Sequence, residues 1–165
     1  MVYSIPQKDW ENFIDLITTK EKIFVYGSGR SGLVGQLFSV RLVQLGLRVY
    51  FIGDMTTPII GKNDLTILIS NTGRTTSVVQ TAEIARRIGS HVVSFTSSPN
   101  SKLAATSDTV IALKIEKDET DSKLAPLGTI FEDTMLFFFD CIVPDIMKKL
   151  GVTEADMRSR HAIWV

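Results

Sequence analysis

The chain has 165 residues, which is enough to bury one hydrophobic core and fits a single domain over 1–165. Apolar residues make up 44% and charged residues 22%, the composition of an ordinary globular protein. The 18 basic and 18 acidic residues balance to a net charge of zero, which argues against a nucleic-acid partner and against an anionic membrane surface.

Cysteine content and apolar runs exclude further classes. Cys141 is the only cysteine, so no disulfide forms within the chain, and the sequence has no CxxC pair or Cys/His cluster to hold a metal. Lys8, Asp9 and Glu11 make the N-terminus unlike a signal peptide. No apolar run approaches the ~18 residues of a membrane helix. We therefore expect a cytoplasmic protein with no membrane partner.

Short runs rich in β-branched residues alternate with helical patterns along the chain. A helix is predicted at 6–19, before the first strand. The predicted strands are nearly continuous in Ile, Val, Leu and Phe, which is typical of strands buried on both faces of a parallel sheet. They span 22–28, 48–53, 64–71, 91–97 and 109–115. The helices between them span 31–45, 75–88 and about 101–106, and Gly46 and Gly89 end the first two.

This alternation predicts an α/β fold, a three-layer sandwich in which helices cover both faces of a five-stranded parallel sheet. We expect the flavodoxin-like or Rossmann-like strand order 2-1-3-4-5, a core over 22–150 and a docking tail over 151–165. The charged segment 114–123 is predicted to be a solvated connection. A long helix should start near Thr129, and its apolar residues suggest burial by several neighbours, including another subunit. Pro144 should kink this helix or end its first part.

The first glycine-rich loop, Gly-Ser-Gly-Arg-Ser-Gly at 27–32, follows the first predicted strand and opens a helix. Its glycines let backbone N–H groups approach an anion, and the helix N-terminus favours negative charge. The loop also satisfies the dinucleotide fingerprint GxGxxG, with Asp54 near the position of a ribose-binding acid. A nucleotide, slightly favoured here, a sugar phosphate and a turn without a ligand all remain open.

The second loop, Ser-Asn-Thr-Gly-Arg-Thr at 70–75, ends the third predicted strand and opens the next helix. Three hydroxyls around one glycine at a helix start can hold a phosphate group. The alternative is local capping, with Thr75 as the N-cap and Ser70 or Thr72 as turn hydroxyls. In the order 2-1-3-4-5 the first and third strands are neighbours, so both loops meet where such sheets bind ligands.

Two further residues are candidates for chemistry. Glu132 completes the capping-box pattern T-x-x-E from Thr129, so it either caps its own helix or acts as a general base; Asp133 is the lesser candidate. His161 precedes three apolar residues, Ile163, Trp164 and Val165, which would be costly to expose. The tail should therefore dock and carry His161 to a defined place, in its own subunit's site or in a neighbour's.

Taken together and in order, the segments 27–32, 54–58, 70–75, 126–132 and 160–161 resemble sugar isomerase (SIS) domains. Among these, the chain is most similar to the 6-phospho-3-hexuloisomerases. The resemblance implies interconversion of D-arabino-hex-3-ulose 6-phosphate and fructose 6-phosphate through an enediolate, in the ribulose monophosphate pathway of formaldehyde fixation. It also implies a homotetramer that needs neither a metal nor a cofactor.

The resemblance also assigns roles. Glu132 would be the base and His161 an assisting group, while Ser70, Thr72 and Thr75 would hold the phosphate. The loop with Arg30 would border the sugar. Apart from the resemblance, electrostatics leads us to expect that Arg30 and backbone N–H groups stabilise the enediolate oxygen. Three alternatives remain: another phosphosugar aldose-ketose isomerase, a non-catalytic sugar-phosphate-binding SIS protein and a dinucleotide-binding module. The implied substrate-binding residues are Gly27, Ser28, Gly29, Arg30, Ser31, Thr57, Ser70, Asn71, Thr72, Gly73, Arg74 and Thr75.

Overall fold

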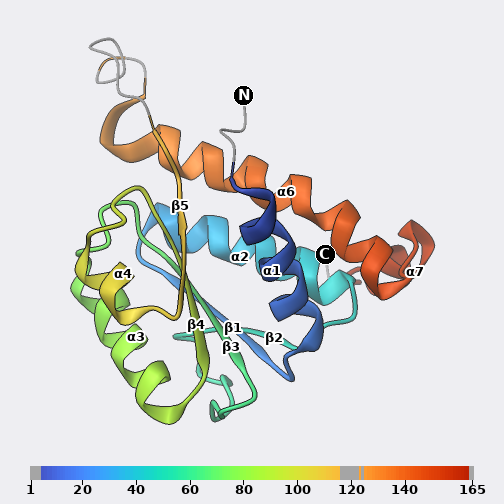
Figure 1. Cartoon of the computed structure of the whole chain (residues 1–165). Helices are drawn as coiled ribbons and strands as arrows, with labels where there is room; N and C mark the ends of the chain where they lie inside the picture. Colours follow the sequence, from blue (N-terminus) through green and yellow to red (C-terminus); the bar gives the residue numbers. More distant parts are fainter. Residues whose placement is uncertain (1–4, 116–122, 124, 164–165) are drawn as a thin grey trace.

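Five parallel strands form one sheet in the order β2-β1-β3-β4-β5, as Figure 1 shows for this computed structural model. The structure describes residues 5–115, 123 and 125–163, so most of the charged segment predicted at 114–123 lies outside it. The observed order and class confirm the predicted α/β fold. The strands are β1 (Ile23–Gly27), β2 (Val49–Phe51), β3 (Leu65–Ile69), β4 (His91–Thr96) and β5 (Thr109–Ala112).

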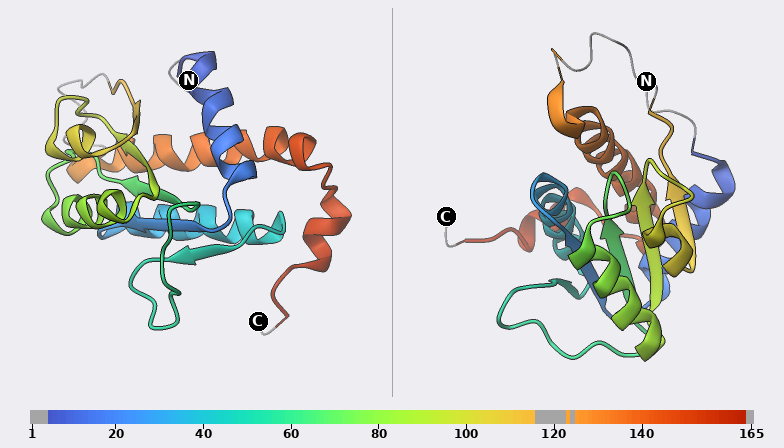
Figure 2. Two further views of the ribbon diagram at one scale, coloured as in Figure 1. Left: turned by 60° about the horizontal axis from the view of Figure 1, so that its bottom comes forward. Right: turned by 90° about the vertical axis from the view of Figure 1, so that its left-hand side faces the viewer.

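Helices cover both faces of this sheet, as predicted (Figures 1 and 2). Successive side chains of a strand point to opposite faces, so Ile67 joins the larger core while its neighbour Leu68 joins the smaller one. This two-sided burial explains why the strands are continuously apolar. The larger core is covered by α1 (Gln7–Thr19), α2 (Arg30–Gln44) and α6 (Thr129–Leu150), and the smaller one by α3 (Thr76–Ile88) and α4 (Lys102–Thr106).

The longest helix, α6, closes the larger core with aromatic side chains. Phe139 stacks on Phe38 of α2 with ring centroids 4.0 Å apart, and it meets Phe95 of β4 edge-on at 5.3 Å. Phe138 contacts the ring of Phe13 from α1 at 6.1 Å. One helix therefore joins α1, α2 and the sheet. None of the helices in the described part of the chain combines the length and apolarity needed to cross a membrane.

Pro144 does not end α6, which continues to Leu150. A proline inside a helix leaves the carbonyl four residues earlier without its partner. Here both Pro144 and Asp140 are exposed, so water can hydrate that carbonyl. Beyond α6, the short helix α7 (Glu154–Ser159) begins with a capping box formed by Thr153 and Asp156.

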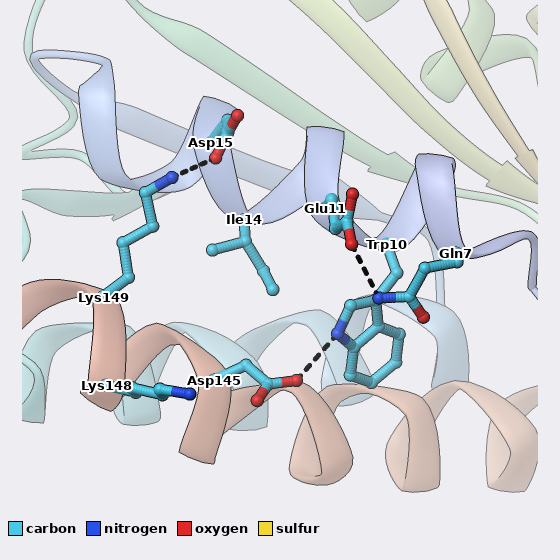
Figure 3. A pocket seen from close by; sticks show the side chains of 8 residues that line it. All are labelled: Gln7, Trp10, Glu11, Ile14, Asp15, Asp145, Lys148 and Lys149. Atoms are coloured by element: carbon cyan, nitrogen blue, oxygen red, sulfur yellow. Dashed lines mark hydrogen bonds and ion pairs between the residues drawn. The ribbon is translucent and has the colours of Figure 1, made fainter.

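Polar contacts fix α1 against α6 (Figure 3). Trp10 Nε1 donates to Asp145 Oδ2 at 2.8 Å, and Lys149 pairs with Asp15. These side chains border a hollow of about 430 Å³. Because the drawn polar groups largely bind one another, the hollow is best explained as the seam between two helices.

We predict that Phe139→Ala lowers the free energy of unfolding by about 3–5 kcal/mol, because it leaves a cavity among buried rings. Urea unfolding followed by circular dichroism measures this. The matched control is Met55→Ala, since Met55 is 99% exposed and its truncation should change stability by less than about 0.5 kcal/mol. Similar small effects of both substitutions would contradict the assignment of this aromatic cluster as the core.

Candidate active site

The two polar loops lie side by side because β1 pairs with β3 in parallel register. Gly27 is opposite Ile69, so Ser28 and Ser70 leave the sheet on neighbouring strands. Neighbouring strands are about 4.8 Å apart, which places the starts of the two loops at nearly that separation. The strand order reverses at this point, since β2 lies on the far side of β1. The prediction that both loops meet at the carboxyl edge is confirmed.

The first loop makes an unusually tight turn from β1 into α2. A Cβ on Gly32 would lie 2.4 Å from the carbonyl oxygen of Gly27, so these two backbones require glycine. Gly29 is the N-cap of α2 with φ 58°, and it brings no capping side chain. The N–H groups in the first turn of α2 are therefore available to an anion. Ser28, Gly29 and Arg30 are exposed, whereas Ser31 is nearly buried.

The second loop opens α3 in the same way. Thr75 is the N-cap of α3, as the capping alternative predicted, but its side chain makes no capping hydrogen bond. Instead, the hydroxyls of Thr75 and Ser70 lie 3.2 Å apart. Thr72 does act as a turn hydroxyl, because its Oγ1 accepts from the backbone N–H of Arg74 at 3.3 Å. A pair of hydroxyls thus lies beside helix N–H groups that lack a side-chain cap.

Residues after β4 brace the second loop. Ser97 Oγ donates to both oxygens of Asn71, at 2.9 Å to the carbonyl and 2.5 Å to Oδ1. Gly73, at φ 60°, is so close to α4 that an added Cβ would lie 2.0 Å from Ser101 Oγ. The sequence interpretation missed Ser97 and Ser101. Their position in a polar stretch directly after the fourth strand, which neighbours the third, was the available signal.

Glu132 does not cap its own helix. The N-cap of α6 is Gly128, which places Glu132 one residue beyond the capping-box position. The Thr129 hydroxyl donates instead to the carbonyl oxygen of Pro126 at 2.6 Å. The Glu132 side chain is 11% exposed, and its Oε2 accepts from Nε of Arg30. The capping interpretation is therefore wrong, and the carboxylate lies against the first loop.

The start of α6 also touches the second loop. The side-chain nitrogen of Asn71 would lie 2.8 Å from a Cβ on Gly128, so these residues are in direct contact. The same Asn71 accepts from Ser97, which makes it a brace between β4 and α6. The first loop, the second loop and the carboxylate of Glu132 therefore converge at one edge of the sheet. Asp133, the lesser candidate, is exposed on the adjacent face of α6.

The ion pair with Glu132 raises the pKa of Arg30 above its ordinary value, through a side-chain hydrogen bond and the opposite charge. Arg30 therefore keeps its positive charge at any physiological pH. The Arg74 side chain borders a hollow of about 230 Å³ together with Ser98 and Ser101. The site thus combines one partly buried carboxylate with a permanent cation.

Thr57 lies in the loop after the edge strand β2. Its hydroxyl donates to the carbonyl oxygens of Phe51 at 3.0 Å and Asp54 at 2.7 Å. Those bonds hold the loop in shape, and the implied contact between Thr57 and a substrate stays a prediction. Asp54 is exposed. Among the described residues, no group of three or more His, Cys, Asp or Glu side chains is placed to hold a metal ion.

His161 lies at the opposite end of α2 from Arg30. Arg160 donates to the carbonyl oxygen of Gln44, the last residue of α2, at 3.2 Å. A helix of 15 residues is about 20 Å long, so His161 and Glu132 do not meet within one chain. In the left view of Figure 2 the start of α6 lies at one end of the molecule, and α7 lies at the other end.

The tail docks only in part. Arg160 packs on Gly46, and His161 borders a groove of about 580 Å³ between α2 and β2. Ile163 is 84% exposed, contrary to the expectation that the apolar tail would be covered. The other two residues of that expectation, Trp164 and Val165, lie outside the described residues. The tail therefore stays close to the chain without reaching the site.

Comparison with known proteins identifies the class that this fold and site define. The SIS domain family matches residues 16–139, and the chain belongs to this family.

Similar proteins narrow the comparison. A 3-hexulose-6-phosphate isomerase of Methanocaldococcus jannaschii is 40% identical over 157 residues, which cover 93% of this chain and 84% of the relative. One from Bacillus subtilis is 31% identical over 162 residues, with 96% and 88% covered. A crystal structure of a Methanococcus jannaschii protein, reported to infer the same function, has a TM-score of 0.89 at 36% identity and covers 96% and 87%.

We predict that Gly73→Ala weakens binding of fructose 6-phosphate at least about tenfold. The new methyl group displaces Ser101 and so shifts the N–H groups of the second loop. The hydrogen bonds of such groups to a charged ligand are worth about 1.5–3 kcal/mol each. Isothermal titration calorimetry measures the affinity. Gly151→Ala is the control: Gly151 also has a positive φ, 66°, but an added Cβ meets no atom within 4 Å. That substitution should cost about 1–2 kcal/mol of stability and leave affinity unchanged. Equal affinity losses in both variants would contradict a binding role for the second loop.

Proposed function

We propose that this protein is a 6-phospho-3-hexuloisomerase, the activity also called 3-hexulose-6-phosphate isomerase, which interconverts D-arabino-hex-3-ulose 6-phosphate and fructose 6-phosphate. The observation that carries the proposal is the position of Glu132: a largely buried carboxylate beside two loops suited to an anion. The identity with relatives that bear this name supports the choice of substrate. We propose that the protein is cytoplasmic and that the reaction is a step of the ribulose monophosphate pathway. The reaction would use no metal or cofactor.

The phosphate would bind at the second loop. The hydroxyls of Ser70 and Thr75 and the N–H groups of the first turn of α3 offer donors from several directions. The substrate's C3 carbonyl could close a five-membered ring only through O6, which carries the phosphate. The sugar therefore binds in its open form, and ring opening is not a required step.

Glu132 would then move one proton. Its carboxylate removes the proton from C2, the electrons of that C–H bond form the C2–C3 double bond of a cis-enediolate, and the C3 oxygen takes the negative charge. The hydroxyl proton on O2 must also pass to O3, a transfer that we propose for His161. Returning the carbon-bound proton to C3, with the carbonyl re-formed at C2, then gives fructose 6-phosphate. The reaction is an internal redox exchange with no net gain or loss of electrons. One carboxylate can reach both carbons because they are adjacent.

Three other functions give different results in simple assays. Another phosphosugar isomerase would act on a different aldose or ketose phosphate. A sensor would bind hexose phosphates without turnover. A dinucleotide-binding module would bind NAD instead; Asp54, its expected ribose ligand, is exposed at the end of the edge strand. One coupled assay, which forms fructose 6-phosphate from formaldehyde and ribulose 5-phosphate with the partner synthase supplied, separates the proposal from all three.

We predict that Glu132→Gln lowers kcat in this assay by at least about 100-fold while fructose 6-phosphate still binds, because the amide keeps the shape but cannot accept the proton. Asp133→Asn, a charge loss at the next residue on an exposed face, should retain near wild-type kcat. Normal turnover by Glu132→Gln would show that another group is the base.

We further propose that the protein is a homo-oligomer, a tetramer by its resemblance to the family, in which His161 serves the site of a neighbouring subunit. Leu33, Leu37 and Val40 follow one side of α2 and are 60%, 54% and 55% exposed, an apolar row that favours contact with another copy. Leu37 is the midpoint of α2. A two-fold axis through it would pack two copies of α2 antiparallel. The Gln44 end of one copy, with its His161, would then lie beside Arg30 and Glu132 of the other.

This arrangement predicts complementation between inactive variants. If Glu132→Gln and His161→Ala are each inactive alone, purified hybrids formed by co-expression should regain up to about half of wild-type activity, because in each hybrid pair one of the two sites has both an intact Glu132 and an intact His161. Tandem affinity tags purify the hybrids for the coupled assay. Leu37→Asp in both chains should remove the activity and reduce the mass measured by light scattering. Active wild-type monomers, or hybrids as inactive as their parents, would contradict the arrangement.

A further inference from the structure

The ion pair between Arg30 and Glu132 joins α2 to α6, and the proposed reaction gives these two side chains different roles. Arg30 is the first residue of α2 and belongs to the anion-binding loop, whereas Glu132 lies in the first turn of α6. The two side chains differ sharply in exposure, 61% for Arg30 and 11% for Glu132. A carboxylate so deeply placed needs a compensating partner. Arg30 is that partner among the described residues.

The guanidinium has more donors than this pair uses. Nε donates to Glu132 Oε2. A guanidinium carries four further N–H groups on its two Nη atoms, in a fixed plane. Within the described part of the chain no hydrogen bond engages these Nη groups, and the exposure of the side chain places them where a ligand at the first loop can reach them.

We propose that Arg30 bridges the base and the substrate: Nε holds the carboxylate of Glu132 while the Nη groups donate to the C2 and C3 oxygens of the sugar. This inference rests on the proposed isomerase function. As Glu132 takes the proton from C2, its carboxylate loses its negative charge and the C3 oxygen gains one. The guanidinium of Arg30 contacts both groups, so it stabilises the negative charge before and after the transfer without moving.

This bridge requires arginine and not merely a positive charge. A planar guanidinium can present one edge to a carboxylate and another to a second acceptor, whereas a lysine ammonium is a compact point charge on a flexible stem. Lysine at position 30 could neutralise Glu132 but could not hold both partners in one fixed geometry. Arg30→Lys therefore separates the bridge from simple charge neutralisation.

Two ligands with the same phosphate distinguish the bridge from general binding. Glucitol 6-phosphate resembles the substrate but carries no charge at C2 and C3. The hydroxamate 4-phosphoerythronohydroxamate has a planar, anionic group whose carbonyl carbon and nitrogen, counted from the phosphate, take the places of C3 and C2 in the cis-enediolate. Because an enzyme is complementary to the charged intermediate, wild-type protein should bind the hydroxamate about 100-fold more tightly or better.

The experiment measures both affinities by calorimetry, and kcat by the coupled assay, for wild type and Arg30→Lys. The bridge predicts that Arg30→Lys lowers kcat about 100-fold, keeps glucitol 6-phosphate affinity within about threefold and reduces the preference for the hydroxamate to about tenfold or less. Lys149→Gln is the control, since it breaks the exposed ion pair with Asp15 at the other end of α6 and should change none of these values.

Other outcomes overturn the bridge. If both ligands weaken by the same factor in Arg30→Lys, then Arg30 only organises the site. If Arg30→Lys keeps wild-type kcat and hydroxamate preference, then charge alone suffices. Wild-type turnover is scored separately: a chain that binds both ligands but forms no fructose 6-phosphate refutes the proposed function, while the ratio of the two affinities still decides the role of Arg30. Urea unfolding of Arg30→Lys confirms that the fold is retained.

Discussion

The pairing of β1 with β3, in parallel and in register, is the constraint on which the site depends. It places the residue after Gly27 beside the residue after Ile69 and so joins two loops that are far apart in the sequence. Each loop opens a helix whose first turn lacks a side-chain cap. Two sets of unpaired N–H groups are therefore aimed at one region, which favours an anionic ligand.

A second constraint comes from the carboxylate of Glu132. Because its side chain is largely buried, its charge must be compensated, and Arg30 of the facing loop does so. The same contact ties α6 to the first loop, while Asn71 ties it to the second. A charged side chain thus contributes to the shape of the site as well as to its electrostatics. The Arg30 side chain is exposed and has N–H donors that Glu132 does not use, so its contact with Glu132 leaves donors available to a ligand.

Local sequence patterns were sufficient for the strand segments, both loops and the N-cap of α3 at Thr75, because each depends on neighbouring residues. The strand order followed from the fold class that these alternating segments define. They failed where distant contacts decide the outcome. The T-x-x-E pattern at Thr129 predicts a cap, yet Glu132 binds an arginine from another helix. Pro144 is tolerated because its side of α6 is exposed. The position of His161 depends on how the tail meets α2, which no local pattern encodes.

The closing of the core by α6 has a consequence for how the protein folds. Phe13 and Phe38 are early in the chain, but they pack on Phe138 and Phe139 from the last long helix. Contacts between such distant segments form slowly, since the loop-closure entropy is lost before the contacts stabilise anything. A growing chain on the ribosome would expose these aromatic rings until α6 emerges. The segment that carries Glu132 therefore completes the hydrophobic core, so a chain that stops before it would be prone to aggregate as well as inactive.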